Sequence, residues 1–120
     1  MGIAVARLDA PVMADTYRVL IARSWPRGCS KQIALDLWSK ELAPGTALQR
    51  WFAHDASRWE TFRHRYAGEL DGKRALWQKL LPQAERHRLC LLHAGVDDEH
   101  NAAQALKIYL EHWLRANKFA

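Results

Sequence analysis

The sequence predicts an α/β fold in a single small domain. Short aliphatic stretches alternate with segments whose apolar residues recur at helical spacing, which is the order expected for a sheet flanked by helices. Residues 89–92 are wholly apolar, as is typical of a strand covered on both faces. The length of 120 residues and the six tryptophans suit one folded domain. We therefore expect a parallel or mixed sheet of about three or four strands.

Three segments are predicted to be strands. They span residues 3–8, 17–21 and 89–93, and the first two are separated by turn-forming residues that include Pro11 and Asp15. The second strand should end near Ala22, because Pro26 cannot donate to a ladder and Gly28 suits a left-handed turn. The third should end near His93, before Gly95.

Helices are predicted between and after these strands. The first spans residues 30–42, with Ser30 as its N-cap, and a short helical turn follows at residues 48–52. Residues 55–70 give the clearest helical period, residues 73–85 a second that Pro82 interrupts, and residues 97–116 a long final helix. The acidic residues 97–99 would suit the positive N-terminus of that helix.

Composition limits the classes of function. Lys and Arg outnumber Asp and Glu by 18 to 13, so the net charge of +5 permits a polyanionic partner without requiring one. We expect a cytoplasmic protein without a membrane segment, since no apolar run reaches about 20 residues and the first residues lack the order of a signal peptide. Cys29 and Cys90 should be reduced thiols, and no pattern implies a cofactor.

Several segments together resemble a known bacterial family. They are Arg18-Val19-Leu20-Ile21, Trp25-Pro26-Arg27-Gly28, Leu42-Ala43-Pro44, residues 50–55, residues 59–66 and Asp97-Asp98-Glu99-His100-Asn101. The chain thus resembles the YeaO-like family, domain of unknown function family 488, over nearly its whole length. The resemblance implies no settled activity.

This chain departs from the family pattern at three positions. Ala22 stands where members usually carry an acidic residue, Val96 where they carry a lysine, and Ser24 where they carry a leucine. The first two positions flank the candidate site described next. The resemblance therefore implies a divergent or weakened version of whatever chemistry the family performs.

Polar side chains follow the second and third predicted strands. Ligands of open α/β sheets bind beyond the carboxyl ends of the strands, so these two loops would face one another if the strands are neighbours. The candidate ligand-binding residues are Arg23, Trp25, Arg27, His93, Asp97, Glu99, His100 and Asn101. Arginine holds phosphate or carboxylate and Trp25 could stack on a base or sugar, which predicts a phosphorylated or nucleotide-like small molecule, a small-molecule anion.

Other interpretations of these residues stay open. The arginines and acids could neutralise one another, with Trp25 as a core plug. No nucleophile has a local base to indicate catalysis, so whether the protein is an enzyme is left open. We predict no metal, since the histidine and acid spacing matches no zinc signature. His54 and Asp55 could form an acid/base pair, but Asp55 stands where a helix N-cap belongs. Cys29 is either a reactive or a buried thiol.

Two further functions are possible on sequence grounds. A nucleic-acid-binding module could use exposed arginines and tryptophans, and its candidate residues are Arg50, Arg58, Arg63 and Arg65. A non-catalytic interaction protein could form a homodimer through Trp113 or Phe119 near the C-terminus, so the chain could be a monomer or a homodimer.

Overall fold

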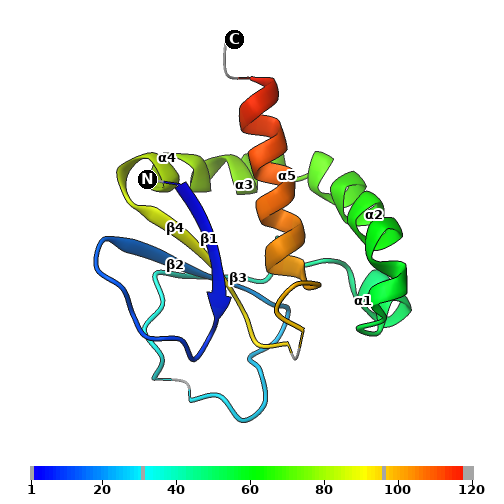
Figure 1. The fold of residues 1–120 in the computed structure, drawn as a ribbon, viewed down its shortest axis with the longest axis horizontal. Coiled ribbons are helices and arrows are strands. Elements are labelled where there is room, and N and C mark those ends of the chain that lie inside the picture. Colours follow the sequence, from blue (N-terminus) through cyan, green and yellow to red (C-terminus); the bar gives the residue numbers. More distant parts are fainter. Residues whose placement is uncertain (1, 31, 96, 118–120) are drawn as a thin grey trace.

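The computed structural model describes residues 2–30, 32–95 and 97–117 and has an α/β fold (Figure 1). Its strands are β1 (Gly2–Arg7), β2 (Thr16–Ile21), β3 (Leu37–Ser39) and β4 (Arg88–His93). Its helices are α1 (Thr46–Phe52), α2 (Trp59–Asp71), α3 (Arg74–Trp77), α4 (Leu81–Arg86) and α5 (Ala102–Ala116), with 3₁₀ turns η1 (Ala56–Arg58) and η2 (Gln78–Leu80). The predicted fold class is confirmed.

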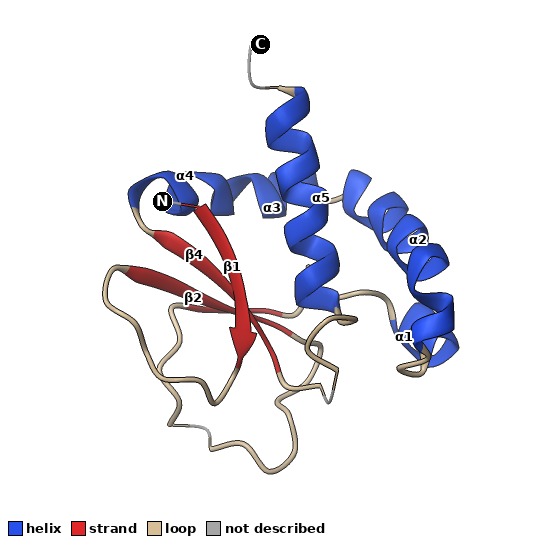
Figure 2. Ribbon diagram, viewed as in Figure 1, coloured by secondary structure: helices blue, strands red, loops and turns tan. Residues whose placement is uncertain are grey.

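The strands form one parallel sheet in the order β1-β4-β2-β3. β4 lies between β1 and β2, with Leu91 opposite Val5 on one side and Val19 on the other. The second and third predicted strands are therefore neighbours, and their carboxyl ends meet at one edge of the sheet. Figure 2 shows that the long loops and the first turn of α5 gather at this edge.

The two faces of the sheet are covered differently. One face carries Val19, Ile21, Leu89 and Leu91, and it packs against the helices in the main core. The other face carries Leu20, Cys90 and Leu92, which pack against Leu8 and against apolar side chains of the loop between β2 and β3: Trp25, Cys29, Ile33 and Leu35. β4 is thus buried on both faces as predicted, but helices flank only one of them.

The helix predicted over residues 30–42 is wrong. The described part of this segment consists of turns, bends and irregular chain around one short strand, because residues Leu37–Ser39 form the edge strand β3 beside Val19–Ile21. Its apolar residues Ile33, Leu35 and Leu37 recur every second position, which is the period of a strand. Asp36 fixes this conformation, because its amide donates to the Arg18 carbonyl (2.9 Å) and its carboxylate accepts from the Arg18 amide (2.7 Å).

Arg18 holds the loop-covered face together. β1 and β2 are both parallel to β4, so residues 8–15 must return across the sheet without a helix. The Arg18 side chain is only 4% exposed, and it donates to the carbonyls of Leu8 (3.1 Å), Ala10 (3.5 Å) and Ala34 (2.9 Å). One guanidinium therefore ties both connecting segments to the sheet.

The remaining helical predictions need two corrections. The final helix begins at Ala102 rather than near Asp97, because Asn101 is its N-cap and accepts from the Gln104 amide (2.9 Å). Residues 73–85 form α3, η2 and α4, with Pro82 inside the first turn of α4, where a missing amide costs little. In the ranges that the structure describes, no helix is both long and apolar enough to cross a membrane.

Candidate functional site

A pocket of about 400 Å³ opens at the carboxyl edge of the sheet, between the ends of β2 and β4 and the start of α5. This size suits a small molecule. Its described wall consists of Ile21, Ala22, Arg23, Ser24, Pro26, Pro44, Gln49, Phe52, His54, Phe62, His93, Ala94, Gly95, Asn101 and Ala102. None of these wall residues is an aspartate or a glutamate, so the charged and titratable side chains on the described wall are Arg23, His54 and His93.

Arg23 is placed by the loop that precedes α1. Its Nε donates to the Pro44 carbonyl (3.0 Å) and one terminal nitrogen donates to the Ala43 carbonyl (3.2 Å). Both acceptors are neutral, and no carboxylate in the described ranges forms an ion pair with Arg23. A guanidinium has five N–H donors, so Arg23 keeps donors and its full charge for a ligand.

His93 lies at the end of β4 and is only 6% exposed. Its Nε2 lies 3.3 Å from Oδ1 of Asp98, and the same carboxylate lies 3.7 Å from the guanidinium of Arg7. Its Nδ1 is buried and has no hydrogen-bond partner among the described residues. Burial lowers the pKa of His93 below its usual value, although the Asp98 charge opposes this, so the imidazole is neutral at neutral pH.

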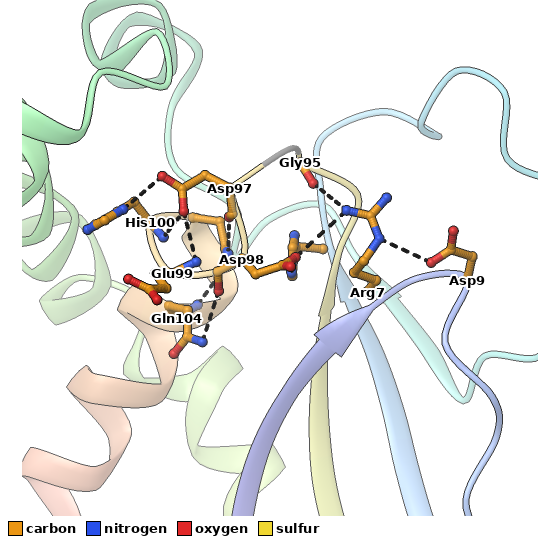
Figure 3. Close-up of polar contacts among 10 residues, drawn as sticks. Arg7, Asp9, Gly95, Asp97, Asp98, Glu99, His100 and Gln104 are labelled. Carbon is orange, nitrogen blue, oxygen red and sulfur yellow. Dashed lines mark hydrogen bonds and ion pairs between the residues drawn. The ribbon is translucent and has the colours of Figure 1, made fainter.

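Arg7 joins β1 to the loop that follows β4. Its guanidinium donates to the Gly95 carbonyl (2.9 Å) and pairs with Asp9 (3.3 Å) as well as Asp98, as Figure 3 shows. Neither Arg7 nor Asp98 is among the site residues predicted from the sequence. The signal that could have found them is the parallel order of β1 and β4, which sets Arg7 opposite His93.

The loop after β4 folds on its own polar contacts. The Asp97 carboxylate accepts from the amides of Glu99 (2.9 Å) and His100 (3.1 Å) and lies 2.8 Å from Nδ1 of His100 (Figure 3). These hydrogen bonds lower the pKa of Asp97, the Glu99 amide contributing most. The His100 ring also meets the edge of Trp59 at 5.2 Å. Asp97 and His100 thus shape the loop and do not line the pocket.

The predicted site residues therefore separate into two groups. Arg23, His93 and Asn101 come together on the pocket wall. The others, Trp25, Arg27, Asp97, Glu99 and His100, do not line it. Trp25 is half-buried on the other face of the sheet, where its indole donates to the Cys29 carbonyl (3.0 Å) and meets Trp38 edge-on at 5.3 Å. Arg27 and Glu99 are exposed.

The structure also bears on three further interpretations of the sequence: an arginine–acid cluster, the role of Asp55 and a metal site. In the described ranges, neither Arg23 nor Arg27 pairs with Asp97 or Glu99, so the predicted arginine–acid cluster does not form. Asp55 caps η1 by accepting from the Ser57 amide (3.0 Å), which agrees with the capping interpretation. Within those ranges no three histidine, cysteine or acidic side chains gather as a metal site would require. Val96 and Phe119 lie outside the described residues.

The arginines proposed for nucleic acid lie on α1, η1 and α2. The guanidinium groups of Arg58 and Arg65 both lie over the Trp51 ring, at 5.2 and 4.4 Å from its centroid. Arg50, which precedes Trp51 in the chain, is exposed. Arg58 lies 3.6 Å from Asp55. Arg63 is half-buried and pairs with Glu60 at 2.6 Å, so it is not the exposed arginine that the sequence suggested.

Comparison with known proteins agrees with the resemblance in the sequence. A family profile described as "Inactive DUF488-N3 subclade" matches residues 2–119. The chain belongs to the DUF488 family. It is 35% identical over 109 residues to "Uncharacterized protein YeaO" of Escherichia coli K12, covering 90% of this chain and 91% of that protein.

A second relative matches over a shorter stretch of the chain. "Uncharacterized protein Rv3073c" of Mycobacterium tuberculosis H37Rv is 38% identical over 63 residues, which is 52% of this chain and 53% of that protein. No solved structure matches the chain. The DUF488 assignment thus rests on matches over nearly the whole chain. It points to a subclade described as inactive and names no ligand.

The neutral state of His93 gives a pH prediction. Its native pKa lies below the unfolded value of about 6.5, so on acidification the unfolded chain takes up the proton first. The contribution of His93 to the free energy of unfolding should therefore rise with pH between its lowered native pKa and about 6.5. Above pH 6.5 this contribution should stay constant. Denaturant unfolding at about pH 5.5 and about pH 7.5 measures this effect. We expect the free energy of unfolding to fall more between pH 7.5 and pH 5.5 in the wild type than in His93→Gln. An equal fall in the free energy of unfolding in both proteins would contradict the neutral state of His93.

Proposed function

We propose that this protein binds, without turnover, a small molecule carrying a phosphate or carboxylate in the pocket at the carboxyl edge of the sheet. The observation that carries this proposal is the charge of the wall: Arg23 lines the pocket, and no aspartate or glutamate does so among its described residues. An anion would meet a guanidinium whose charge is not neutralised by a neighbouring carboxylate.

The start of α5 supports the same ligand class. Asn101 and Ala102 line the pocket, and α5 extends for 15 residues from Ala102, so its positive end faces the cavity. The first amides of a helix lack intrahelical partners, and Asn101 satisfies only that of Gln104 with its side chain. Amides near Ala102 can therefore donate to anionic oxygens, as in other anion sites at helix N-termini.

Binding without turnover is favoured by what the pocket lacks. The family pattern places an acidic residue where this chain has Ala22, and Ala22 lines the pocket. A methyl group there leaves no carboxyl group at this position to act as a general acid or base, and it carries no negative charge that would repel an anion. The description of the subclade as inactive supports the same proposal.

Calorimetric titration with ethyl phosphate and with propionate, at constant ionic strength, tests this function. We expect saturable binding of at least one anion to one site per chain. Ethanol, which lacks the anionic group, is the control and should give no saturable heat. Absence of saturable binding of either anion at millimolar concentrations, where the binding free energy is only about −4 kcal/mol, would contradict the proposal.

A second candidate is nucleic-acid binding on the surface around Trp51. This candidate is supported by the stacking of Arg58 and Arg65 on the Trp51 indole. Arg50 is exposed on α1, the short helix that also carries Trp51. The ion pairs of Arg58 with Asp55 and of Arg63 with Glu60 reduce the charge available. This function predicts that fluorescence anisotropy of a single-stranded oligonucleotide shows binding that weakens steeply with salt; no binding at low salt would exclude it.

A further inference from the structure

We infer that the bound molecule carries, beside its anionic group, a hydroxyl that donates a hydrogen bond to Nδ1 of His93. This inference deepens the proposed function and rests on it. It concerns the part of the pocket formed by His93, Gly95 and His54, on the β4 side of the cavity and apart from Arg23 on the loop after β2.

The central observation is an unsatisfied buried atom. His93 lines the pocket, its residue is only 6% exposed, and its Nδ1 has no partner among the described residues. Buried side-chain nitrogens in folded proteins nearly always have a hydrogen-bond partner, so an exception calls for a specific explanation, and a functional site is one such explanation. A ligand in the cavity is the partner that the protein itself does not supply.

The environment of His93 determines what that partner must be. The Asp98 carboxylate, 3.3 Å from Nε2, can only accept, so it favours the tautomer with its hydrogen on Nε2. Arg7 helps to hold Asp98 in place, because the same carboxylate oxygen lies 3.7 Å from its guanidinium. In a neutral imidazole the other nitrogen then has a free lone pair, so Nδ1 accepts and the ligand must donate.

A hydroxyl fits this requirement better than an ammonium group. Arg7 lies near His93 through their shared Asp98, and Arg23 is a lining residue of the same pocket. Two guanidinium charges near the cavity disfavour a third cation within it, and the Asp98 charge is already paired with Arg7. An alcohol donates without adding charge, so the ligand class is a hydroxylated phosphate or carboxylate.

Gly95 lies beside Nδ1 of His93, which is closed to solvent, so a neighbouring wall group has to move before a hydroxyl can reach this nitrogen. A Cβ placed on Gly95 would lie 3.9 Å from Nδ1 of His93 and 3.8 Å from Cε1 of His54, and glycine leaves that volume empty. His54 is exposed and takes part in none of the hydrogen bonds of the described residues. Its imidazole is therefore the wall group that can turn aside to admit the hydroxyl.

A matched pair of probes separates this inference from the proposed function. Ethyl phosphate and 2-hydroxyethyl phosphate carry the same anionic group and differ by one hydroxyl. We expect the wild type to bind the hydroxylated ester about tenfold more tightly, which corresponds to about 1.4 kcal/mol. Equal affinities would overturn the inference and leave the anion site intact. Failure of both esters to bind would overturn the proposed function and this inference with it.

Gly95→Ala tests the location of the hydroxyl. The added methyl would make only ordinary contacts, at 3.8 and 3.9 Å, so we expect the variant to fold, and the measured quantity is the ratio of its dissociation constants for the two esters rather than either affinity alone. The variant should lose the preference for 2-hydroxyethyl phosphate, and a retained preference would overturn the inference. A second measurement uses the wild type alone: the ¹⁵N resonance of His93 Nδ1 should shift on addition of 2-hydroxyethyl phosphate and not of ethyl phosphate. No such difference would also overturn it.

Discussion

Arg23→Gln is expected to weaken binding of ethyl phosphate roughly tenfold to a hundredfold, because a hydrogen bond to a charged partner contributes about 1.5–3 kcal/mol. Among the described residues of the pocket wall, Arg23 is the one with a lysine or arginine side chain, and its own partners are two neutral carbonyls. Glutamine retains a donor but removes the charge. The dissociation constant from calorimetric titration measures the effect.

Arg27→Gln is the matched control for this experiment. Arg27 lies in the same loop, and the substitution changes the net charge equally, but the side chain is exposed and does not line the pocket. We expect its affinity to remain within about twofold of the wild type, since it should lose only screened long-range attraction. Equal weakening in the two variants would indicate a general charge effect rather than a site at Arg23.

The second large effect is expected on stability. Arg18→Met should lower the free energy of unfolding by about 3 kcal/mol, because it leaves up to three carbonyl acceptors without their donor and a buried unpaired acceptor costs about 1–3 kcal/mol. The affected carbonyls belong to Leu8, Ala10 and Ala34, in the two segments that cover the second face of the sheet. Urea unfolding of the purified variants measures the change.

Arg115→Met provides the comparison for Arg18. Arg115 is exposed in the last turn of α5, so its loss should change the free energy of unfolding by no more than about 0.5 kcal/mol. If Arg18→Met were no more destabilising than Arg115→Met, the three carbonyl contacts of Arg18 would not stabilise the loop-covered face.

The elements with strong periodicity were predictable from the sequence. The aromatic spacing of Trp59, Phe62 and Tyr66 indicated α2, and the aliphatic run at residues 89–92 indicated β4. The strand β3 was not predicted, because Ser30 and the apolar residues 33–38 also satisfy a helical pattern. Its pairing with β2, and the contacts of Asp36 with Arg18, are tertiary interactions that outweigh this local pattern.

The candidate site was predictable only where it follows the strands. Arg23 lies two residues after the end of β2, and His93 is the last residue of β4. Because neighbouring parallel strands end at the same edge of a sheet, these two residues could be predicted to lie close together. Trp25 and Arg27 follow the same strand, but Trp25 packs with the apolar residues on the other face of the sheet and Arg27 is exposed. Gln49 and His54 reach the pocket from the α1 region, and no local pattern indicates this.

The most direct test of the anion pocket is a titration followed by ¹H–¹⁵N correlation spectra of the wild-type protein with ethyl phosphate. We expect saturable shifts concentrated on the amides of Ala22, Arg23, Gly95, Asn101 and Ala102, which line the pocket. Shifts concentrated around Trp51, Arg58 and Arg65 would move the anion site to the α1–α2 surface and contradict the proposal, as would a spectrum that does not change.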